Sequence, residues 1–360
     1  MVPPRTPGLT ASPSPLQYES IRDLWANAQI VRCWGSNSEG QLGDGTTVNS
    51  PAPVQATGVN DAADVSVGRE HACVRTSSGA VQCWGDNLYG QLGTGNWSDS
   101  LTPAVVNNVS NAAVLTVGAN HTCVAYLSTA VCWGQNNQGQ LGNGGSINSN
   151  LPVNVAPITN ERDISAGYDT TCTVLLDGTA WCWGNDDSGQ LGNATNPNPA
   201  LTPVQVSGLT TTALIGAGEE HTCAVVSDGS GRCWGLNYHG QLGNNGVGMM
   251  QTTPVVVTGL SNAVAITSGN MHSCALLNDG TVVCWGSNTN GQIGDGTNTN
   301  RLTFAPVLGL TNVAAVEAGS SHSCAVVDDG TAWCWGYNAN GQLGDGTTTN
   351  SNVPVQVVGL

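Results

Sequence analysis

The stretch that decides the fold is residues 319–347, which read GSSHSCAVVDDGTAWCWGYNANGQLGDGT. Its central tripeptide, Cys-Trp-Gly, recurs about every fifty residues, and each copy runs into a version of Asn-x-x-Gly-Gln-Leu-Gly. The seven copies begin at Cys33, Cys83, Cys132, Cys182, Cys233, Cys284 and Cys334. A period of this length indicates a repeat array or a propeller, in which each repeat is one supersecondary unit.

Each repeat contains the pattern of four short strands. In the last repeat, four segments consist of apolar residues that alternate with small or polar ones or follow one another, and turn residues separate the segments. They are residues 313–319, 322–327, 331–336 and 353–360. Four strands with tight turns match one propeller blade. We therefore expect an all-β fold, a seven-bladed β-propeller of four-stranded antiparallel blades, over residues 21–360. Residues 1–20 form a separate Pro/Ser-rich N-terminal arm.

The first repeat is irregular. The strand with His-x-Cys is missing from it, and Asp23 stands where its cysteine would be. Residues 21–32 have the right length to supply a degenerate hairpin. We expect them to pair beside the C-terminal segment, so that strands from both termini close the ring.

Twelve of the thirteen cysteines fall into six pairs. In residues 328–330 (Asp-Asp-Gly) the glycine can take the left-handed position of a hairpin loop with a bulge, which puts Cys324 directly opposite Cys334. The same argument predicts one disulfide in each of six blades: Cys73–Cys83, Cys123–Cys132, Cys172–Cys182, Cys223–Cys233, Cys274–Cys284 and Cys324–Cys334. Cys33 is left unpaired, either free or bonded to another molecule.

This cysteine usage favours an oxidising compartment, so we expect an extracellular or cell-surface location. Residues 1–20 contain no apolar stretch of signal-peptide length, so the chain would be a mature or truncated form, or be exported by other means. The net charge is −16, with eight arginines and no lysine. That balance argues against nucleic acid and anionic membranes as partners, and no stretch predicts membrane insertion.

The repeats resemble those of the regulator of chromosome condensation family. Residues 269–297, GNMHSCALLNDGTVVCWGSNTNGQIGDGT, match its pattern as closely as residues 319–347 do. The resemblance covers residues 21–360 and implies a seven-bladed β-propeller. The paired cysteines depart from the best-known nuclear members and resemble a cysteine-rich subset of secreted or surface-associated bacterial proteins.

The family's founding activity, guanine nucleotide exchange on a small nuclear GTPase with chromatin docking through a basic tail, fits this acidic chain poorly. Other members act as protein-binding propellers, among them a secreted bacterial inhibitor that caps a β-lactamase. Because a fold does not by itself carry a function, the resemblance implies only a rigid disc with a loop-lined face for recognition.

The repeated polar and aromatic residues have structural explanations. Histidine precedes the second-strand cysteine in five repeats, at His71, His121, His221, His272 and His322. Thr170 replaces it in another repeat and no repeat supplies a fourth ligand, so we expect structural histidines bonded to a neighbouring loop rather than metal ligands. The tryptophans of Cys-Trp-Gly predict packing between blades. The Gly-Asp-Gly-Thr loops at Asp44, Asp295 and Asp345 predict turns rather than calcium sites. No catalytic set, metal site or cofactor motif stands out, so we expect no enzyme.

What differs between the repeats is more informative for binding. Aromatic and methionine side chains interrupt otherwise polar loops at Leu88, Tyr89, Trp97, Tyr168, Tyr238, His239, Met249, Met250 and Tyr337. Such side chains are the common anchors of interfaces, although isolated exposed residues are the alternative reading. We expect a non-enzymatic binding propeller that recognises a protein or cell-surface macromolecule through loops on one face. The alternatives are a structural subunit that self-assembles into a surface layer or appendage, and a glycan-binding propeller.

Overall fold

All regular elements that the structure describes are β-strands. It is a computed structural model that describes residues 30–126, 128–195, 199–248 and 250–360. In these residues no helix is long and apolar enough to span a membrane. We number the repeats 1 to 7 along the chain and name the strands of a full repeat inner, second, third and outer.

Repeats 2 to 7 each form one four-stranded antiparallel sheet. Repeat 2 has β3 (Ala62–Val67), β4 (His71–Thr76), β5 (Val81–Gly85) and β6 (Ser100–Val105). Repeat 3 has β7 (Val114–Val117), β8 (His121–Ala125), β9 (Ala130–Gly134) and β10 (Ser149–Asn154). Repeat 4 has β11 (Glu161–Ala166), β12 (Thr170–Leu175), β13 (Ala180–Gly184) and β14 (Ala200–Gln205).

The remaining repeats follow the same order. Repeat 5 has β15 (Thr212–Ala217), β16 (His221–Val226), β17 (Gly231–Gly235) and β18 (Gln251–Val256). Repeat 6 has β19 (Ala263–Ser268), β20 (His272–Leu277), β21 (Val282–Gly286) and β22 (Arg301–Pro306). Repeat 7 has β23 (Val313–Ala318), β24 (His322–Val327), β25 (Ala332–Gly336) and β26 (Ser351–Gln356). Repeat 1 contributes only β1 (Arg32–Gly35) and β2 (Ser50–Gln55).

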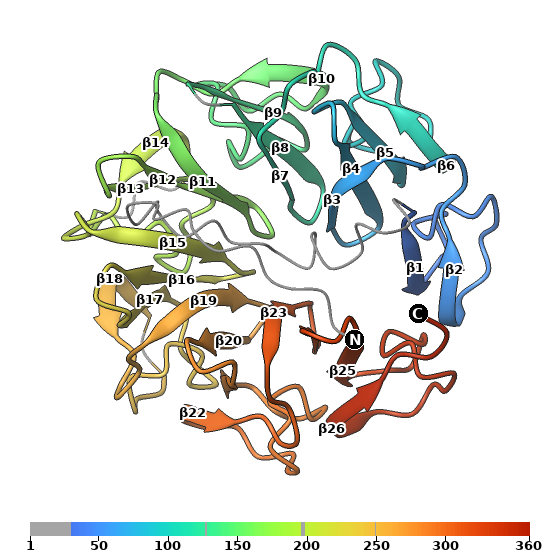
Figure 1. The fold of residues 1–360 in the computed structure, drawn as a ribbon. Helices are drawn as coiled ribbons and strands as arrows, with labels where there is room; N and C mark the ends of the chain where they lie inside the picture. Colours follow the sequence, from blue (N-terminus) through green and yellow to red (C-terminus); the bar gives the residue numbers. More distant parts are fainter. Residues whose placement is uncertain (1–29, 127, 196–198, 249) are drawn as a thin grey trace, which may run out of the picture.

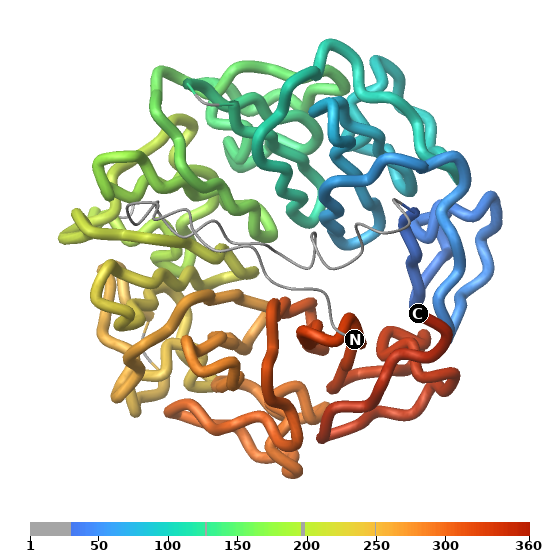
Figure 2. Tube along the Cα trace, viewed as in Figure 1, coloured from blue at the N-terminus to red at the C-terminus, as the bar shows by residue number. Residues whose placement is uncertain are grey.

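The sheets are arranged around a central axis like the blades of a propeller (Figure 1). The inner strands β3, β7, β11, β15, β19 and β23 contact one another around that axis. Figure 2 shows the chain advancing once around the ring, so that its first and last described segments lie side by side. A propeller of four-stranded antiparallel blades is therefore confirmed.

The predicted count of seven four-stranded blades is not confirmed. Six such blades lie in the described residues, and repeat 1 forms a two-stranded sheet, β1–β2. Most of residues 21–32, which we expected to complete it, lie outside the described residues, as does the arm of residues 1–20. The expected mixed pairing at the closure is not seen in the described residues: β26 pairs with β25, and β1 pairs with β2. Repeat 7 already supplies four strands of its own, so its sheet is complete without a strand from the other terminus.

The antiparallel order fixes two faces of the ring. At one end of the blades the inner strand turns into the second, and the third strand runs through the glycine-rich loop into the outer strand. We call this end the loop face. The opposite face carries the hairpins between the second and third strands and the connections from each outer strand to the next inner strand.

A ring of glycines surrounds the axis at the loop face. Gly218 does not have a positive φ, yet a Cβ atom there would lie 2.5 Å from the main-chain oxygen of Gly269 in the next repeat. Because the neighbouring turns approach so closely, their backbones are joined by hydrogen bonds. They are Arg69 N to Ala119 O, Ala119 N to Gly167 O, Tyr168 N to Gly218 O, Glu219 N to Gly269 O and Asn270 N to Ser320 O, at 3.1–3.3 Å. The inner turns of repeats 2 to 7 are thus joined into one collar.

Candidate functional site

The Trp and Gln of the repeated motif join each blade to the next. The indole Nε1 of Trp335 donates to the main-chain oxygen of Gln292 in the preceding repeat, at 2.9 Å. The same bond links Trp84 to Gln41, Trp133 to Gln91, Trp183 to Gln140, Trp234 to Gln190 and Trp285 to Gln241. These six tryptophans are fully buried, so the predicted packing between blades is confirmed for them.

The same bond also joins the two ends of the described chain. Trp34 of repeat 1 donates its indole N–H to the main-chain oxygen of Gln342 in repeat 7, at 2.9 Å. The guanidinium of Arg32 donates to the main-chain oxygen of Gly359. Repeat 1 therefore occupies a sector of the ring between repeats 7 and 2, although only two of its strands are described.

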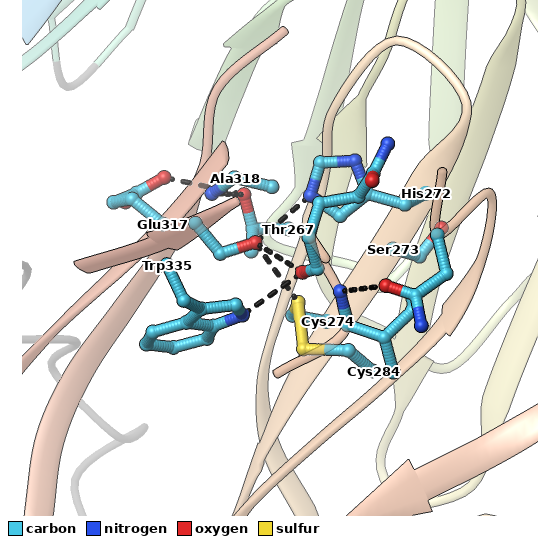
Figure 3. The surroundings of a disulfide bond; sticks show 12 residues. Thr267, His272, Ser273, Cys274, Cys284, Glu317, Ala318 and Trp335 are labelled. Carbon is cyan, nitrogen blue, oxygen red and sulfur yellow. Dashed lines mark hydrogen bonds between the residues drawn. A yellow bond between two sulfur atoms is a disulfide. The ribbon is translucent and has the colours of Figure 1, made fainter. Parts of the chain in front are cut away.

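The histidines belong to the same joints. In Figure 3, His272 points from one blade toward the next, where its Nε2 lies 2.9 Å from the hydroxyl of Ser323. That hydroxyl donates its own proton to the main-chain oxygen of Gln292, so the Nε2 of His272 carries a proton and donates it. Burial lowers the pKa of His272 to about 3, and the imidazole is neutral at physiological pH.

Three other histidines repeat this contact, in the pairs His71–Thr122, His121–Thr171 and His221–Ser273, at 2.8–3.0 Å. The expectation of a neighbouring loop as their partner was wrong, because the hydroxyl belongs to the second strand of the next blade. Among the described residues, no three His, Cys, Asp or Glu side chains gather where they could hold a metal ion.

All six predicted disulfides are present. In each blade the two cysteines lie directly opposite on the second and third strands, as Cys274 and Cys284 do in Figure 3. Cys33 is the free cysteine of the chain. It packs against the apolar cluster around Trp84, and burial, with the nearby Asp44 carboxylate, raises the pKa of its thiol to about 12. Such a thiol is a poor nucleophile at neutral pH.

The Asn of the motif holds the long loop in shape. In repeat 7 the Asn338 amide donates to the main-chain oxygens of Thr347 and Thr349, and its oxygen accepts from the Leu343 N–H. The carboxylate of Asp345 accepts from the N–H and the hydroxyl of Thr347, so Gly-Asp-Gly-Thr forms a turn there. With these residues committed to the scaffold, the side chains left for recognition are those that vary between repeats.

The candidate binding residues that the structure describes all come from loops of the loop face. Leu88, Trp97, Tyr238 and Met250 are exposed, by 50–67% of their surface. Tyr89, Tyr168, His239 and Tyr337 are half-buried. Met249 lies outside the described residues. The structure therefore brings eight of the nine residues to one face, but spreads them over four repeats.

Sequence reasoning missed three exposed aliphatic residues in the same loops. Val48, Ile147 and Val247 lie in the long loops of repeats 1, 3 and 5, and are exposed by 70%, 83% and 54%. An aliphatic residue in a loop of Asn, Thr and Ser was the available signal. We call the exposed apolar side chains of the long loops of repeats 1 to 3, with those of the outer strands that follow them, the apolar sector: Val48, Leu88, Trp97, Leu101, Ile147 and Leu151.

The apolar sector is continuous through the backbone. Gly45 in the loop of repeat 1 donates its N–H to the oxygen of Leu101, and Gly95 in the loop of repeat 2 donates to Asn150. Each loop is thus fixed to the outer strand of the following repeat. By contrast, the segments that follow Gly-Gln-x-Gly in repeats 6 and 7, residues 295–300 and 345–350, consist of Asn, Thr, Asp and Gly.

The centre of the loop face is polar and mainly acidic. Arg69 of repeat 2 reaches past repeat 3 and donates to the hydroxyl of Tyr168 in repeat 4, at 3.0 Å. Next to Tyr168, burial raises the pKa of Asp169 to about 6, although the Gln140 amide donates to its carboxylate at 2.7 Å. Burial and the neighbouring Glu220 also raise the pKa of Glu219. The centre is therefore suited to a basic partner group.

Comparison with curated proteins finds relatives over short segments. The chain is 33% identical over 97 residues to protein pim1 of Schizosaccharomyces pombe, a match that covers 23% of this chain and 18% of pim1. It is 37% identical over 89 residues to the ultraviolet-B receptor UVR8 of Arabidopsis thaliana, covering 24% of this chain and 20% of the receptor. The matched segments thus span a fifth or less of these relatives.

Comparison with solved structures covers the whole ring. Yeast RCC1 (Prp20), in a crystal structure bound to Kap60, superposes with a TM-score of 0.81 at 21% identity over 99% of this chain and 91% of that chain. Human WBSCR16 superposes with a TM-score of 0.82 at 20% identity, over 92% of this chain and 94% of that chain. At these identities the likeness shows the fold. A family model described as the RCC1-like domain matches residues 30–360. The chain therefore belongs to the RCC1-like domain family.

Proposed function

We propose that this chain is a non-enzymatic propeller that binds a protein or cell-surface macromolecule through the apolar sector of its loop face. One observation carries this proposal: large exposed apolar side chains occur in the long loops of three consecutive repeats, 1 to 3, and again only in repeat 5 among the described loops, while the equivalent loops of repeats 6 and 7 are polar. The fold does not require the difference, because the same scaffold contacts hold both kinds of loop. Exposed apolar patches with aromatic residues are typical of interfaces.

The charge of the molecule indicates the kind of partner. Asp44, Asp86 and Asp99 lie in the same loops as the apolar sector, and the chain as a whole has a net charge of −16. A partner with an apolar centre and a basic rim would complement this surface. Protein binding is also a property of structural relatives: yeast RCC1 (Prp20) has been crystallised bound to Kap60, and the same yeast protein has binding properties toward Gsp1p and histones.

The experiment begins with the partner. The protein is purified from its native source, the macromolecule that co-elutes is identified, and its Kd is measured by calorimetry. Trp97→Ala together with Ile147→Ala should weaken binding at least tenfold, since an anchor at an interface contributes upwards of about 1.4 kcal/mol. Thr348→Ala, an exposed change in the equivalent loop of repeat 7, is the control. An equal loss in the control, or none in the double variant, contradicts the proposal; co-elution of a second copy alone favours self-assembly.

We also propose that the protein works outside the cell or on its surface. Six disulfides support this location, because oxidising compartments are where such bridges form and persist. Alkylation of denatured native-source protein without reductant should label one cysteine, Cys33, or none if it is bonded to another molecule. Labelling of all thirteen would exclude the location.

Repeat 1 is proposed to be the outer half of a seventh blade. Its Trp34 and Arg32 already contact repeat 7, and Cys33 pairs in register with Val54 as third-strand cysteines do with outer strands elsewhere. Amide exchange of residues 21–29 measures this directly. Protection there comparable to that of β3 would support the blade, and rapid exchange would count against it.

A further inference from the structure

The opposite face has a groove at repeat 4 that the proposed function does not use. Two adjoining depressions of about 430 and 580 Å³ share Thr159 and Leu175 as lining residues. They run between the connection that leads into β11, the hairpin of β12 and β13, and the outer strand β14. We call them together the Trp181 groove. Their volumes lie within the range of roughly 300–1,000 Å³ that is usual for small-molecule sites.

The apolar part of the groove is built around a fixed indole ring. Trp181, on β13, is half-buried, and its Nε1 donates to the hydroxyl of Thr179 at 3.1 Å. Pro157 and Pro203 line the same depression. A ring held by a hydrogen bond beside two rigid prolines offers a flat apolar surface at small conformational cost.

The polar part consists of groups that the protein leaves available. In the described part of the chain, the side chains of Thr159, Asn160 and Thr202 have no hydrogen-bond partner. Asp177 uses Oδ1 to accept from the N–H and hydroxyl of Thr179, at 2.9 and 2.7 Å. Those two bonds lower its pKa, so its carboxylate is ionised and its Oδ2 is available as an acceptor.

The side chains that line the Trp181 groove indicate which class of ligand it would bind. Hydroxyl, amide and carboxylate groups beside an indole suit a molecule with one apolar face and many hydroxyls. No lysine or arginine lines the groove, and its one charged lining side chain is Asp177, so anionic ligands are disfavoured. We propose that the Trp181 groove binds a neutral oligosaccharide, with a sugar ring stacked on Trp181 and hydroxyls donating to Asp177.

Repeat 7 provides an internal control. Trp333 occupies the position of Trp181, and its Nε1 likewise donates to Thr331, whose N–H and hydroxyl donate to Asp329. Six groove residues differ there, and three of the changes alter the character of the site: Gly309 stands for Pro157, Asp328 for Leu176, and Val353 for Thr202. The indole of Trp333 therefore lacks one of the two prolines, although Pro354 keeps the place of Pro203, and it lacks one of the hydroxyls.

The test titrates the protein with hexasaccharides of β-1,4-linked glucose, N-acetylglucosamine and mannose, by calorimetry and saturation-transfer NMR. At least one should bind, and Trp181→Ala should weaken binding at least tenfold while Trp333→Ala leaves it unchanged. Because Trp181 also packs against the core, Asp177→Asn is the second variant: its amide oxygen still accepts from Thr179, so folding is kept while the Oδ2 acceptor is lost. It should weaken binding several-fold, and Asp329→Asn should not.

Three results would overturn the proposal. The first is that no hexasaccharide binds at millimolar concentration. The second is an equal loss of affinity in the repeat 4 and repeat 7 variants. The third is that a proline-rich peptide, such as one copying residues 1–20, binds in place of the sugars and depends on Trp181. The outcome is independent of the proposed function, because the apolar sector lies on the other face and its variants leave the Trp181 groove untouched.

Discussion

At the scale of single residues, the inner turns of neighbouring blades can bond to one another only because glycine, which has no side chain, lies between them. Gly218 and its counterparts allow the inner turns to approach until their backbones bond. Their φ values are not positive, so the reason for glycine there is space rather than backbone conformation. The collar is therefore sensitive to a single methyl group.

Gly218→Ala should consequently destabilise the protein by about 2 kcal/mol, since forcing extra atoms into a closely packed site typically costs 1–3 kcal/mol. Gly145→Ala is the matched control: its φ is not positive, and the added Cβ would meet only the Asn143 side chain, at 3.5 Å. Urea unfolding followed by circular dichroism measures both. If the two variants have the same midpoint, close approach is not the reason for the glycine.

The buried histidines make stability depend on pH. Burial lowers the pKa of His71, His121 and His272 to about 3 and that of His221 and His322 to about 4. The unfolded chain takes up these protons below about pH 6.5 and the folded chain does not, so stability is lost as the pH falls from 6.5 toward 4. Burial raises the pKa values of Asp169 and Asp186 to about 6 and also raises those of Glu161 and Glu219, so these four carboxyls act in the opposite sense.

We expect the five histidines to outweigh the four carboxyls, so that the free energy of unfolding is several kcal/mol lower at pH 5 than at pH 7. Below the pKa of the unfolded state, each such histidine lowers the free energy of unfolding by about 1.4 kcal/mol for each pH unit. His121→Thr, which copies the residue found at Thr170, should reduce the slope of stability against pH over this interval. Denaturation at several pH values measures the slope, and an unchanged slope would show that His121 is not neutral when folded.

At the scale of elements, each hairpin of second and third strands is a closed unit. Its disulfide joins directly opposed residues about ten positions apart in sequence. Changing Cys274 and Cys284 together to alanine should lower stability by about 2–3 kcal/mol, the usual effect of a bridge that closes so short a loop. Because the bridge lies within one blade, the loss of amide protection should centre on repeat 6. Loss spread evenly around the ring would mean that the bridges support the blade joints instead.

The hairpin of second and third strands was predicted well from the sequence, and the contacts between neighbouring blades were predicted less well. The period-two alternation and the Asp-Asp-Gly turn were enough to place Cys324 opposite Cys334. The partner of His272 was misassigned to a loop, because the hydroxyl of Ser323 lies fifty-one residues away on the next blade. Its signal, Ser or Thr directly before the second-strand cysteine, was visible but had no meaning without the ring geometry.

The candidate sites also differ in whether a local stretch of sequence could reveal them. The loop residues were predictable because they break a repeated pattern, and Val48 and Ile147 were overlooked only because aliphatic residues are less conspicuous than aromatic ones. The Trp181 groove was not predictable. Its walls come from Pro157, Trp181 and Pro203, which lie in three segments that only the fold brings together.

At the scale of the whole molecule, one hydrogen bond of the repeated kind joins the ends of the described chain. Trp34→Phe keeps an aromatic ring but leaves the Gln342 oxygen without the indole donor. It should cost about 1 kcal/mol and increase amide exchange in both repeat 1 and repeat 7. Trp285→Phe, which removes the same bond between two interior repeats, is the control and should act on repeats 5 and 6. Equal effects at all positions would mean that the closure is not a distinct joint.

The placement of the disulfides inside single hairpins also determines how the molecule can be made. The two thiols of each pair leave the ribosome or a translocation channel within about ten residues of each other. Short-loop closure has the smallest entropic barrier, so for each cysteine the correct partner is also the nearest one in time. Each hairpin can be oxidised before the next has emerged, and the ring can assemble from units whose bridges need no later reshuffling.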